Sequence, residues 1–362
     1  MERSDIRLAL PSKGILQEGA MAFLEACGLK IFRPNPRQYA ATIPAMPDVT
    51  VLFQRPGDIV MGVRSGSLEF GITGLDVLAE KTVAGSENGN DVSAVLVIHD
   101  ALGFGPCSLK LAVPEAAPVQ SVGELARWAQ VRGHPLRVAT KFPHLTRQFL
   151  QYSNVGPYKL VQIEGTLEIA PAMGNADLIC DLVSSGITLR DNHLRPLKDG
   201  VILHSQAVLI GNRRALRERP EVLAAARYLL EYIEGHMRGS GSYLITANIR
   251  GESAEAIAGC MFEQATIGGL QGPTIAPVVV RDHLRSDTNW YAINIVVRRD
   301  KLFEAVNELR AIGGSGVVVV PCAYIFDEEP ARYQAMLSAL QFESPVISRE
   351  NPLDSLTEVN VR

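Results

Sequence analysis

The sequence predicts an α/β protein with largely parallel sheets, followed by a smaller domain of different strand order. In the first two thirds of the chain, short apolar runs are followed by a loop and then by a stretch of helical period. The length of 362 residues corresponds to about two to three domains. A content of 47% hydrophobic and 20% charged residues is ordinary for a globular chain.

Each strand–loop–helix unit can be read from the sequence in turn. The first is IRLAL from Ile6, the loop Pro11 to Gly14, and a helical pattern that Gly28 can cap at its C-terminus. The same order returns at LEFGIT with DVLAEK, at LRVAT with PHLTRQFLQY, and at DLICDLV with a helix that begins near Thr188. Short loops between such units favour parallel strands.

Two further apolar strands, 107–114 and 204–211, bracket the middle of the chain. If they cross between two lobes, residues 105–199 form a second lobe inserted into a first lobe of residues 1–104 and 200–238. Open α/β sheets bind ligands at the carboxyl ends of their strands, so the sequence predicts a cleft where the loops of the two lobes face each other.

The last third predicts a β-α-β-β-α-β order. The segments are YLITANI, SAEAIAGCMFEQA, TIAPVVV, WYAINIVV, KLFEAVNELRAI and VVVVPC. This order is the ferredoxin-like unit that many small regulatory domains use. We therefore expect a domain at 239–335, followed by a polar tail at 336–362 that is flexible or loosely docked.

Charge and residue spacing exclude several classes of protein. The net charge is −4 without a block of like charges, and no apolar run reaches about 18 residues, so we expect neither a nucleic-acid nor a membrane partner. The five cysteines lie far apart and the seven histidines lack metal spacing. No G-x-S-x-G or early G-x-G-x-x-G occurs. The start resembles no signal or transit peptide, so we expect an unprocessed protein in a reducing cytoplasm or plastid-like interior.

The stretch ADLICDLVSSGITL, residues 176–189, is the most informative for chemistry. Hydroxyl residues around Gly186 at the start of a helix offer N–H and O–H donors to a phosphate. Asp181, just before them, cannot bind phosphate but can accept hydrogen bonds from ribose hydroxyls. The combination predicts a sugar-phosphate site. The alternative is that Ser185 only caps the helix and Asp181 forms a salt bridge.

Two other strand ends carry possible phosphate ligands. Lys13 follows the first strand and Arg55 follows VTVLF, where each cation can meet phosphate oxygens. Gly74 and Asp76 follow LEFGIT at the start of a helix. The alternatives are a surface salt bridge for Arg55 and a helix cap for Asp76.

The order of LPSKGIL, FQRPGDI, LEFGITGLDVL, RVATKFPHL, EGTLEIAPAMGNAD, ADLICDLVSSGITL, GLQGPTIAPV and AIGGSGVVVVP resembles the long form of the ATP phosphoribosyltransferases, over residues 5–335. The resemblance implies a two-lobed catalytic unit akin to periplasmic binding proteins, a regulatory domain that binds the inhibitor L-histidine, and a cytoplasmic homohexamer built from dimers. The implied reaction joins N1 of ATP to C1 of phosphoribosyl pyrophosphate (PRPP), the first step of histidine biosynthesis. It releases pyrophosphate in the presence of Mg²⁺ carried by substrate phosphates rather than by protein ligands.

The resemblance also places the family's site residues on this chain. The PRPP contacts fall on Asp177, Asp181, Ser184, Ser185, Gly186 and Thr188. The nucleotide and pyrophosphate contacts fall on Lys13, Arg55, Gly74, Asp76 and Glu168, with Lys13 and Arg55 as the catalytic cations. The histidine site falls on Leu270, Thr274, Gly314, Ser315 and Gly316. Ala247 departs from the pattern, because some relatives have an acid there to pair with the ligand's ammonium.

Two rival functions remain at this point. A non-catalytic solute-binding protein would also have two α/β lobes, although such proteins usually carry an export signal and have no ferredoxin-like domain. Another phosphoribosyltransferase would share the acid followed by a phosphate loop, but normally with two adjacent acids where this chain has Cys180 and Asp181.

Overall fold

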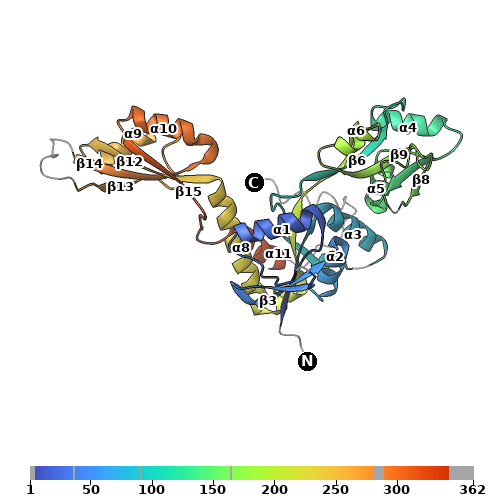
Figure 1. Cartoon of the computed structure of the whole chain (residues 1–362), viewed down its shortest axis with the longest axis horizontal. Helices are drawn as coiled ribbons and strands as arrows, with labels where there is room; N and C mark the ends of the chain where they lie inside the picture. The colour runs from blue at the N-terminus through green and yellow to red at the C-terminus, as the bar shows by residue number, and fades with distance from the viewer. Residues whose placement is uncertain (1–4, 36, 90, 164, 280–288, 342–362) are drawn as a thin grey trace. The chain divides into compact units, whose positions relative to one another are not determined.

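The computed structural model describes residues 5–35, 37–89, 91–163, 165–279 and 289–341 (Figure 1). These residues divide into two compact units, the first Met1–Ala226 with Arg332–Arg362 and the second Arg227–Ala331. The first unit contains two sheets and the second contains one.

The first lobe is built on a six-stranded sheet. Its strands in spatial order are β2 (Ala40–Ile43), β3 (Met46–Gln54), β1 (Ile6–Pro11), β4 (Phe70–Gly74), β11 (Ala207–Asn212) and β5 (Val95–His99). The helices of this lobe are α1 (Gly14–Ala26), α2 (Pro56–Ser65), α3 (Leu75–Glu87) and α7 (Arg213–Glu218). Because β1 is parallel to both β3 and β4, the loops that follow these three strands lie at one edge of the sheet.

The second lobe is built on a five-stranded sheet. Its strands in spatial order are β10 (Leu194–Ser205), β6 (Cys107–Pro114), β9 (Leu178–Val183), β7 (Leu136–Thr140) and β8 (Tyr158–Val161). Its helices are α4 (Val122–Val131), α5 (Pro143–Tyr152) and the short α6 (Ile187–Asp191). Strands β7 and β9 are parallel, so the loops 140–143 and 183–187 also share an edge.

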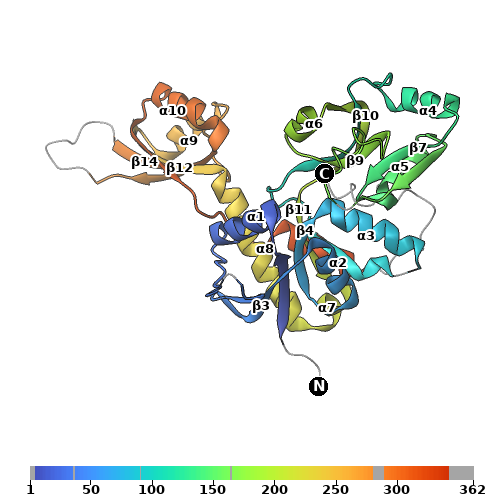
Figure 2. The same cartoon turned by 45° about the vertical axis from the view of Figure 1, so that its right-hand side comes forward.

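The chain crosses between the lobes where the sequence predicted it. The expected strand 204–211 is interrupted at Gln206: Ser205 ends β10 opposite Cys107 in one sheet, and Ala207 begins β11 opposite Gly74 in the other. In the neighbouring pairs of the second sheet, Ser108 lies opposite Val183, the last residue of β9. The carboxyl ends of β4 and β9 therefore both adjoin this crossing, with β4 and β11 side by side at the centre of Figure 2.

A second contact between the lobes joins helix α3 to the start of α5. The Glu80 carboxylate of α3 accepts hydrogen bonds from the backbone N–H groups of His144 and Leu145, both at 2.9 Å. Its side chain is buried. A carboxylate at a helix N-terminus satisfies donors that the helix itself leaves unpaired. This contact fixes α5 of the second lobe against α3 of the first.

The expected polar tail from residue 336 is wrong for its first six residues. Residues Ala331–Gln341 form helix α11, whose Tyr333, Met336 and Leu340 repeat at helical spacing and are buried. The helix belongs to the first unit, where the Arg332 guanidinium lies 2.8 Å from the Asp100 carboxylate. Residues 342–362 lie outside the described chain.

The second unit has the predicted β-α-β-β-α-β order. Its elements are α8 (Pro220–Ser240, shared with the first unit), β12 (Ser242–Gly251), α9 (Ala254–Phe262), β13 (Thr274–Pro277), β14 (Asn289–Arg298), α10 (Leu302–Ala311) and β15 (Ser315–Pro321). The spatial order β13-β14-β12-β15 is that of a ferredoxin-like sheet. Its limits, Arg227 and Ala331, differ from the expected 239–335, because α8 continues across the boundary and α11 returns to the first unit.

Candidate active site

Lys13 and Arg55 occupy equivalent positions in two loops. Each is the N-cap residue of the helix that follows a parallel strand, Lys13 for α1 after β1 and Arg55 for α2 after β3. The N–H of Ser12 donates to the Gln54 carbonyl at 2.8 Å and ties the two loops together. Both cationic side chains are exposed and form no ion pair with any residue in the described part of the chain. The surface salt bridge considered for Arg55 is therefore not found there, and both charges are open to an anionic ligand.

The loop after β4 turns its carboxylate inward. Asp76 is 4% exposed, its N–H donates to Ser205 Oγ at 2.9 Å, and that hydroxyl donates to Asp76 Oδ1 at 2.6 Å. Burial raises the pKa of Asp76, and the hydrogen bond from Ser205 partly opposes this shift. A Cβ on Gly74 would lie 2.4 Å from Asp76 Oδ1, so a larger residue there would displace the Asp76 carboxylate from this position. Asp76 thus fixes the loop to the crossing between the lobes, through a partner that spacing in the sequence does not reveal.

Asp181 lies near the end of β9 with two partners from other loops. It is half-buried, and its Oδ1 accepts from the Leu182 N–H at 2.8 Å. Burial is the main cause that raises the pKa of Asp181; the Leu182 N–H and Lys141 lower it, and the charge of Glu168 raises it. The structure thus brings Asp181, Lys141 and Glu168 close enough to interact electrostatically. Asp181 forms no ion pair within the described residues, in contrast to the salt-bridge alternative.

The loop after Asp181 leaves donors unused. Ser184, Ser185 and Thr188 are exposed, and Gly186 has φ +73° as the N-cap of α6. The Ile187 N–H points to Ser185 Oγ at 3.4 Å, so this serine does act as a weak local cap. The hydroxyls of Ser184 and Thr188 bond to no other described residue. Because α6 has only five residues, loop N–H and O–H groups, rather than a long helix dipole, are available for a phosphate.

Asp177 is not brought to this loop. It precedes β9, whereas Ser184 follows it, and a six-residue strand separates them by about 20 Å. The Asp177 carboxylate is 9% exposed and pairs with Arg132 Nη2 at 2.9 Å and Arg137 Nη2 at 3.1 Å. Burial alone would raise the pKa of Asp177, but the hydrogen bonds and charges of Arg137 and Arg132 lower it. The geometry gives Asp177 arginine partners at the end of β9 away from the loop 184–188, and its contact with PRPP remains a prediction.

The expected histidine-site residues lie on turns and strand ends of the second unit. Leu270 is 58% exposed and Thr274 begins β13. Gly313 (φ +92°) and Gly316 (φ +61°) require the left-handed region, and a Cβ on Gly314 would meet the Leu309 carbonyl at 2.6 Å. Ser315 Oγ donates to the Asn248 carbonyl at 3.3 Å.

Strand register adds residues that the sequence did not reveal. Thr274 lies opposite Asn294, which lies opposite Thr246, so these polar side chains share one face of the sheet. Thr246 Oγ1 and Asn294 Oδ1 are 2.7 Å apart. Ala247 is 1% exposed and faces the opposite, apolar side. An acid at position 247 would thus be buried in the core, so the face with Thr274 depends on other polar groups.

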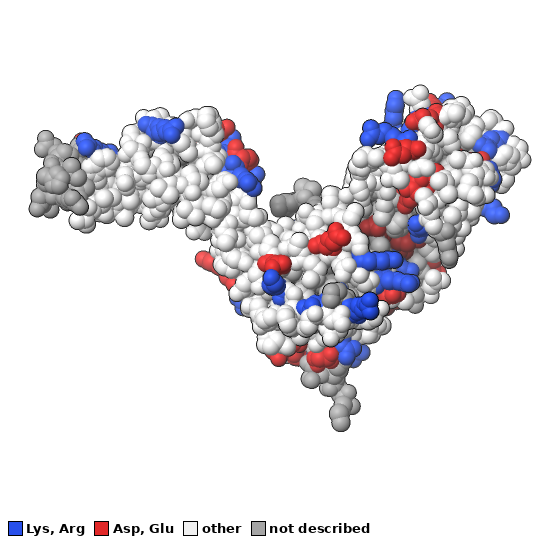
Figure 3. Space-filling model, in the orientation of Figure 1, with Lys and Arg blue, Asp and Glu red and all other residues white. Residues whose placement is uncertain are grey.

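Two further searches cover the described residues only. No group of three or more His, Cys, Asp or Glu side chains among them could hold a metal ion. In the same part of the chain, no helix is long and apolar enough to cross a membrane. On the face drawn in Figure 3, basic and acidic side chains are interspersed.

Known proteins match the chain along most of its length. A family described as ATP phosphoribosyltransferase matches residues 55–235, and one described as HisG, C-terminal domain, matches residues 240–324. ATP phosphoribosyltransferase 1, chloroplastic, of Arabidopsis thaliana is 42% identical over 344 residues, which cover 94% of this chain and 82% of the relative. ATP phosphoribosyltransferase of Gemmatimonas aurantiaca is 34% identical over 318 residues, covering 87% and 97%. A solved ATP phosphoribosyl transferase (HisG:HisZ) complex from Thermotoga maritima is 25% identical, covers 63% of this chain and 98% of its own, and has a TM-score of 0.49.

Proposed function

The chain belongs to the ATP phosphoribosyltransferase family and is a transferase, and from this premise we propose that it transfers the phosphoribosyl group of PRPP to N1 of ATP. The products are N1-(5-phospho-β-D-ribosyl)-ATP and pyrophosphate, and the reaction is the first step of L-histidine biosynthesis. The observation that supports this most directly is the end of β9, where the half-buried Asp181 precedes Ser184 and Thr188, whose hydroxyls bond to no other residue that the structure describes.

The residues fit a mechanism of positioning and charge stabilisation. The lone pair of adenine N1 forms the new bond to C1 of the ribose while the C1–O bond to pyrophosphate breaks and its electron pair leaves with pyrophosphate. The nucleophile needs no activated serine or cysteine. Asp181 accepts hydrogen bonds from ribose hydroxyls, the loop 184–188 binds the 5-phosphate, and Lys13 and Arg55 meet the charge on the departing pyrophosphate or triphosphate.

Magnesium enters this proposal with the substrates. The ion is satisfied by phosphate oxygens, waters and one or two carboxylates, and the pair Asp181 and Glu168 offers no more than that. When bound, Mg²⁺ would neutralise part of the pyrophosphate charge.

Assay of the purified chain with ATP, PRPP and Mg²⁺ tests the reaction, with phosphoribosyl-ATP and pyrophosphate as the measured products. We expect Asp181→Ala and Thr188→Ala to lower kcat/KM for PRPP by about 5- to 150-fold, the equivalent of about 1–3 kcal/mol. KM for ATP should change little. Asp48→Ala, an exposed acid on β3, is the matched control. Unchanged PRPP dependence in both variants would refute the assignment of the loop, and ATP binding without turnover would favour a solute-binding protein.

For the second unit we propose that L-histidine binds the face of Thr274, Asn294 and Ser315 and inhibits the enzyme. The polar row and the glycine turn beside Ser315 supply donors and acceptors for the ligand's ammonium, carboxylate and ring. Inhibition requires that histidine bind two states of the enzyme with different affinity. We also propose a cytoplasmic homohexamer built from dimers, which sedimentation of the intact chain tests.

Point variants test the histidine site more cleanly than truncation. Ending the chain near Gly239 would remove α11, which packs in the first unit. Calorimetry and activity assays on the full chain should therefore compare the parent with Thr274→Val, and with Thr42→Val on β2 as the control. Absence of binding and of inhibition at millimolar L-histidine would refute the regulatory proposal without affecting the transferase.

A further inference from the structure

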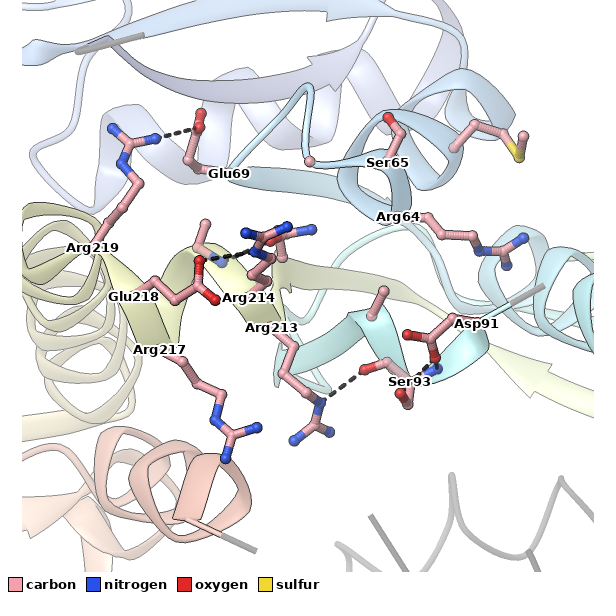
Figure 4. A pocket seen from close by; sticks show the side chains of 15 residues that line it. Arg64, Ser65, Glu69, Asp91, Ser93, Arg213, Arg214, Arg217, Glu218 and Arg219 are labelled. Carbon is pink, nitrogen blue, oxygen red and sulfur yellow. Dashed lines mark hydrogen bonds and ion pairs between the residues drawn. The ribbon is translucent and has the colours of Figure 1, made fainter. Parts of the chain in front are cut away.

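A pocket of about 950 Å³ in the first lobe lies apart from the loops described above (Figure 4). Its lining includes Glu69 just before β4, Ser93 just before β5 and Asn212 at the end of the antiparallel β11. These positions mark the edge of the sheet where β4 and β5 begin. The candidate active-site loops follow the opposite ends of the parallel strands, and β4 alone spans about 16 Å.

The lining of this pocket is rich in arginine. It contains five arginines, Arg64, Arg213, Arg214, Arg217 and Arg219, and three acids, Glu69, Asp91 and Glu218. The chain as a whole has net charge −4, so the excess of positive charge is local to the pocket. A concave surface of one charge concentrates the field on a bound ion of opposite charge.

Two of the five arginines are neutralised within the lining. Arg219 Nη1 lies 2.7 Å from Glu69 Oε1, and Arg214 Nε lies 2.8 Å from Glu218 Oε2. The third acid, Asp91, has its Oδ1 occupied by the N–H and hydroxyl of Ser93, at 2.9 and 2.6 Å. None of the three acids lies within ion-pair distance of Arg64, Arg213 or Arg217 among the described residues. The charge of Asp91 nevertheless acts on Arg64 and Arg213, because burial lowers the pKa of both guanidinium groups and Asp91 raises it in part.

The guanidinium groups of the other three arginines differ in their hydrogen bonds: two donate to backbone carbonyls, and the third has no partner among the described residues. Arg64 Nη2 donates to the Lys81 carbonyl at 2.8 Å, and its buried Nε has no partner. Arg213 donates to the carbonyls of Ser93 and Ala339, at 2.8 and 2.7 Å. Arg217 makes no hydrogen bond or ion pair with the described residues. Carbonyl groups thus hold Arg64 and Arg213 in place, and a carbonyl carries no charge that would cancel that of the guanidinium group.

Arg213 and Arg217 stand one helical turn apart on α7 and point in the same direction (Figure 4). Burial lowers the pKa of Arg213 and the charge of Arg217 lowers it further, as expected for like charges held together, while the charge of Asp91 partly opposes the shift. Two positive charges held close together repel each other. An anion between the two guanidinium groups would offset this repulsion by accepting charge-assisted hydrogen bonds from both.

We propose that this pocket binds a small phosphate-bearing anion, with its phosphate group between Arg213 and Arg217 and Arg64 on the neighbouring wall. Guanidinium groups bind phosphate oxygens in a bidentate manner. Three of them face one acid, Asp91, that is not already in an ion pair of the lining, so positive charge remains in excess at this wall. The volume is in the range of small-molecule sites, and Met61, Ala94 and Ala215 form an apolar wall for an organic portion of the ligand. The proposal does not depend on the transferase reaction.

Calorimetry in Mg²⁺-free buffer tests the site, with pyrophosphate and glycerol 3-phosphate as separate probes. Pyrophosphate also fits the proposed active site, so the titration is repeated with the Thr188→Ala chain. We expect a class of binding that persists in Thr188→Ala and weakens at least tenfold in Arg217→Gln. Arg217 has no partner in the described chain, so its loss should leave the fold intact, which circular dichroism and urea unfolding verify.

Arg214→Gln is the matched control, because this arginine also lines the pocket but is paired with Glu218. Its affinity should stay within about twofold of the parent, as expected for the loss of an exposed charge that is already paired. Binding of glycerol 3-phosphate would identify a phosphate ester as the ligand, and binding of pyrophosphate alone a free polyphosphate. The proposal is overturned if neither probe binds in Thr188→Ala, or if Arg217→Gln and Arg214→Gln have equal effects.

Discussion

Asp177 directly precedes β9 and Asp181 lies within it, yet the two should respond to substitution in opposite ways. Asp177 accepts the Arg137 N–H at 2.8 Å and pairs with the guanidinium groups of Arg132 and Arg137. Asp177→Asn keeps the shape of the side chain but replaces one acceptor oxygen by an NH₂ group that faces guanidinium donors. We expect a loss of stability with little change in turnover, whereas Asp181→Asn should do the reverse.

The loss of unfolding free energy in Asp177→Asn can be estimated from the two arginines that would lose their carboxylate partner. The Asp177 side chain is buried and Arg132 is largely buried, but Arg137 is 39% exposed, so solvent screens its share. A hydrogen bond to a charged group contributes about 1.5–3 kcal/mol, and one buried interaction plus one screened interaction gives about 2–3 kcal/mol at neutral pH.

The pH dependence has a defined sign. The native pKa of Asp177 is below its ordinary value, so its contribution is present above the ordinary pKa and is lost as the pH falls through the native pKa. The difference in unfolding free energy between the parent and Asp177→Asn should therefore be constant near neutrality. It should shrink below about pH 4, where the unfolded chain begins to take up the proton.

Urea unfolding followed by tryptophan fluorescence measures this difference. The chain has two tryptophans, and Arg132 stacks over the ring of Trp128 at 4.1 Å, so Trp128 reports on the corner that Asp177 holds. Trp290 lies in the second unit and is replaced by Phe in both proteins. An unchanged midpoint at pH 7 in Asp177→Asn, or a turnover loss as large as that of Asp181→Asn, would refute the structural role of Asp177.

Three other variants test the site and the junction between the lobes. Because burial raises the pKa of Asp181, turnover of the parent should fall with decreasing pH from a point above the ordinary pKa of aspartate, and this acid limb of the pH profile should be absent in Asp181→Asn. Arg55→Lys should lower kcat/KM by about tenfold or more, since lysine cannot bind phosphate in a bidentate manner, and parent-like kinetics would contradict that contact. Glu80→Gln should destabilise the first unit by about 1–3 kcal/mol, measured by urea unfolding, because one of the two N–H groups at the start of α5 loses its acceptor; Glu18→Gln, an exposed substitution on α1, is the control.

The strand–loop–helix units could be predicted because each strand end is marked by a change from an apolar run to Gly, Pro, Ser or Lys. The limit of the second unit could not, since α8 is one continuous helical pattern whose packing partner changes at Ala226. Helix α11 was missed although Tyr333, Met336 and Leu340 have helical spacing, because the polar residues that follow dominate the composition of the whole segment.

Site residues can be predicted from the sequence where they lie in one loop. They cannot be predicted where two residues come together only because two distant segments of the chain are adjacent in the fold. Ser184 and Thr188 lie in one loop, so their sequence spacing is enough. Ser205 reaches Asp76 across 129 positions, and Thr246 meets Asn294 only through strand register. Register depends on the whole sheet, so no local pattern indicates these pairs.

The charged residues beside the strands of the first unit differ between the two ends of the strands. At the ends where β4 and β9 begin, Glu69 is buried, Asp177 is largely buried, and both are paired with arginine. At the ends where β1 and β3 finish, Lys13 and Arg55 are exposed and have no ion pair within the described chain. Pairing thus serves stability at one edge, and open charge is available to ligands at the other. Arg217 departs from this pattern, because it lies at the stabilising edge and has no ion pair among the residues that the structure describes. That departure is the physical reason to look for an anion beside it.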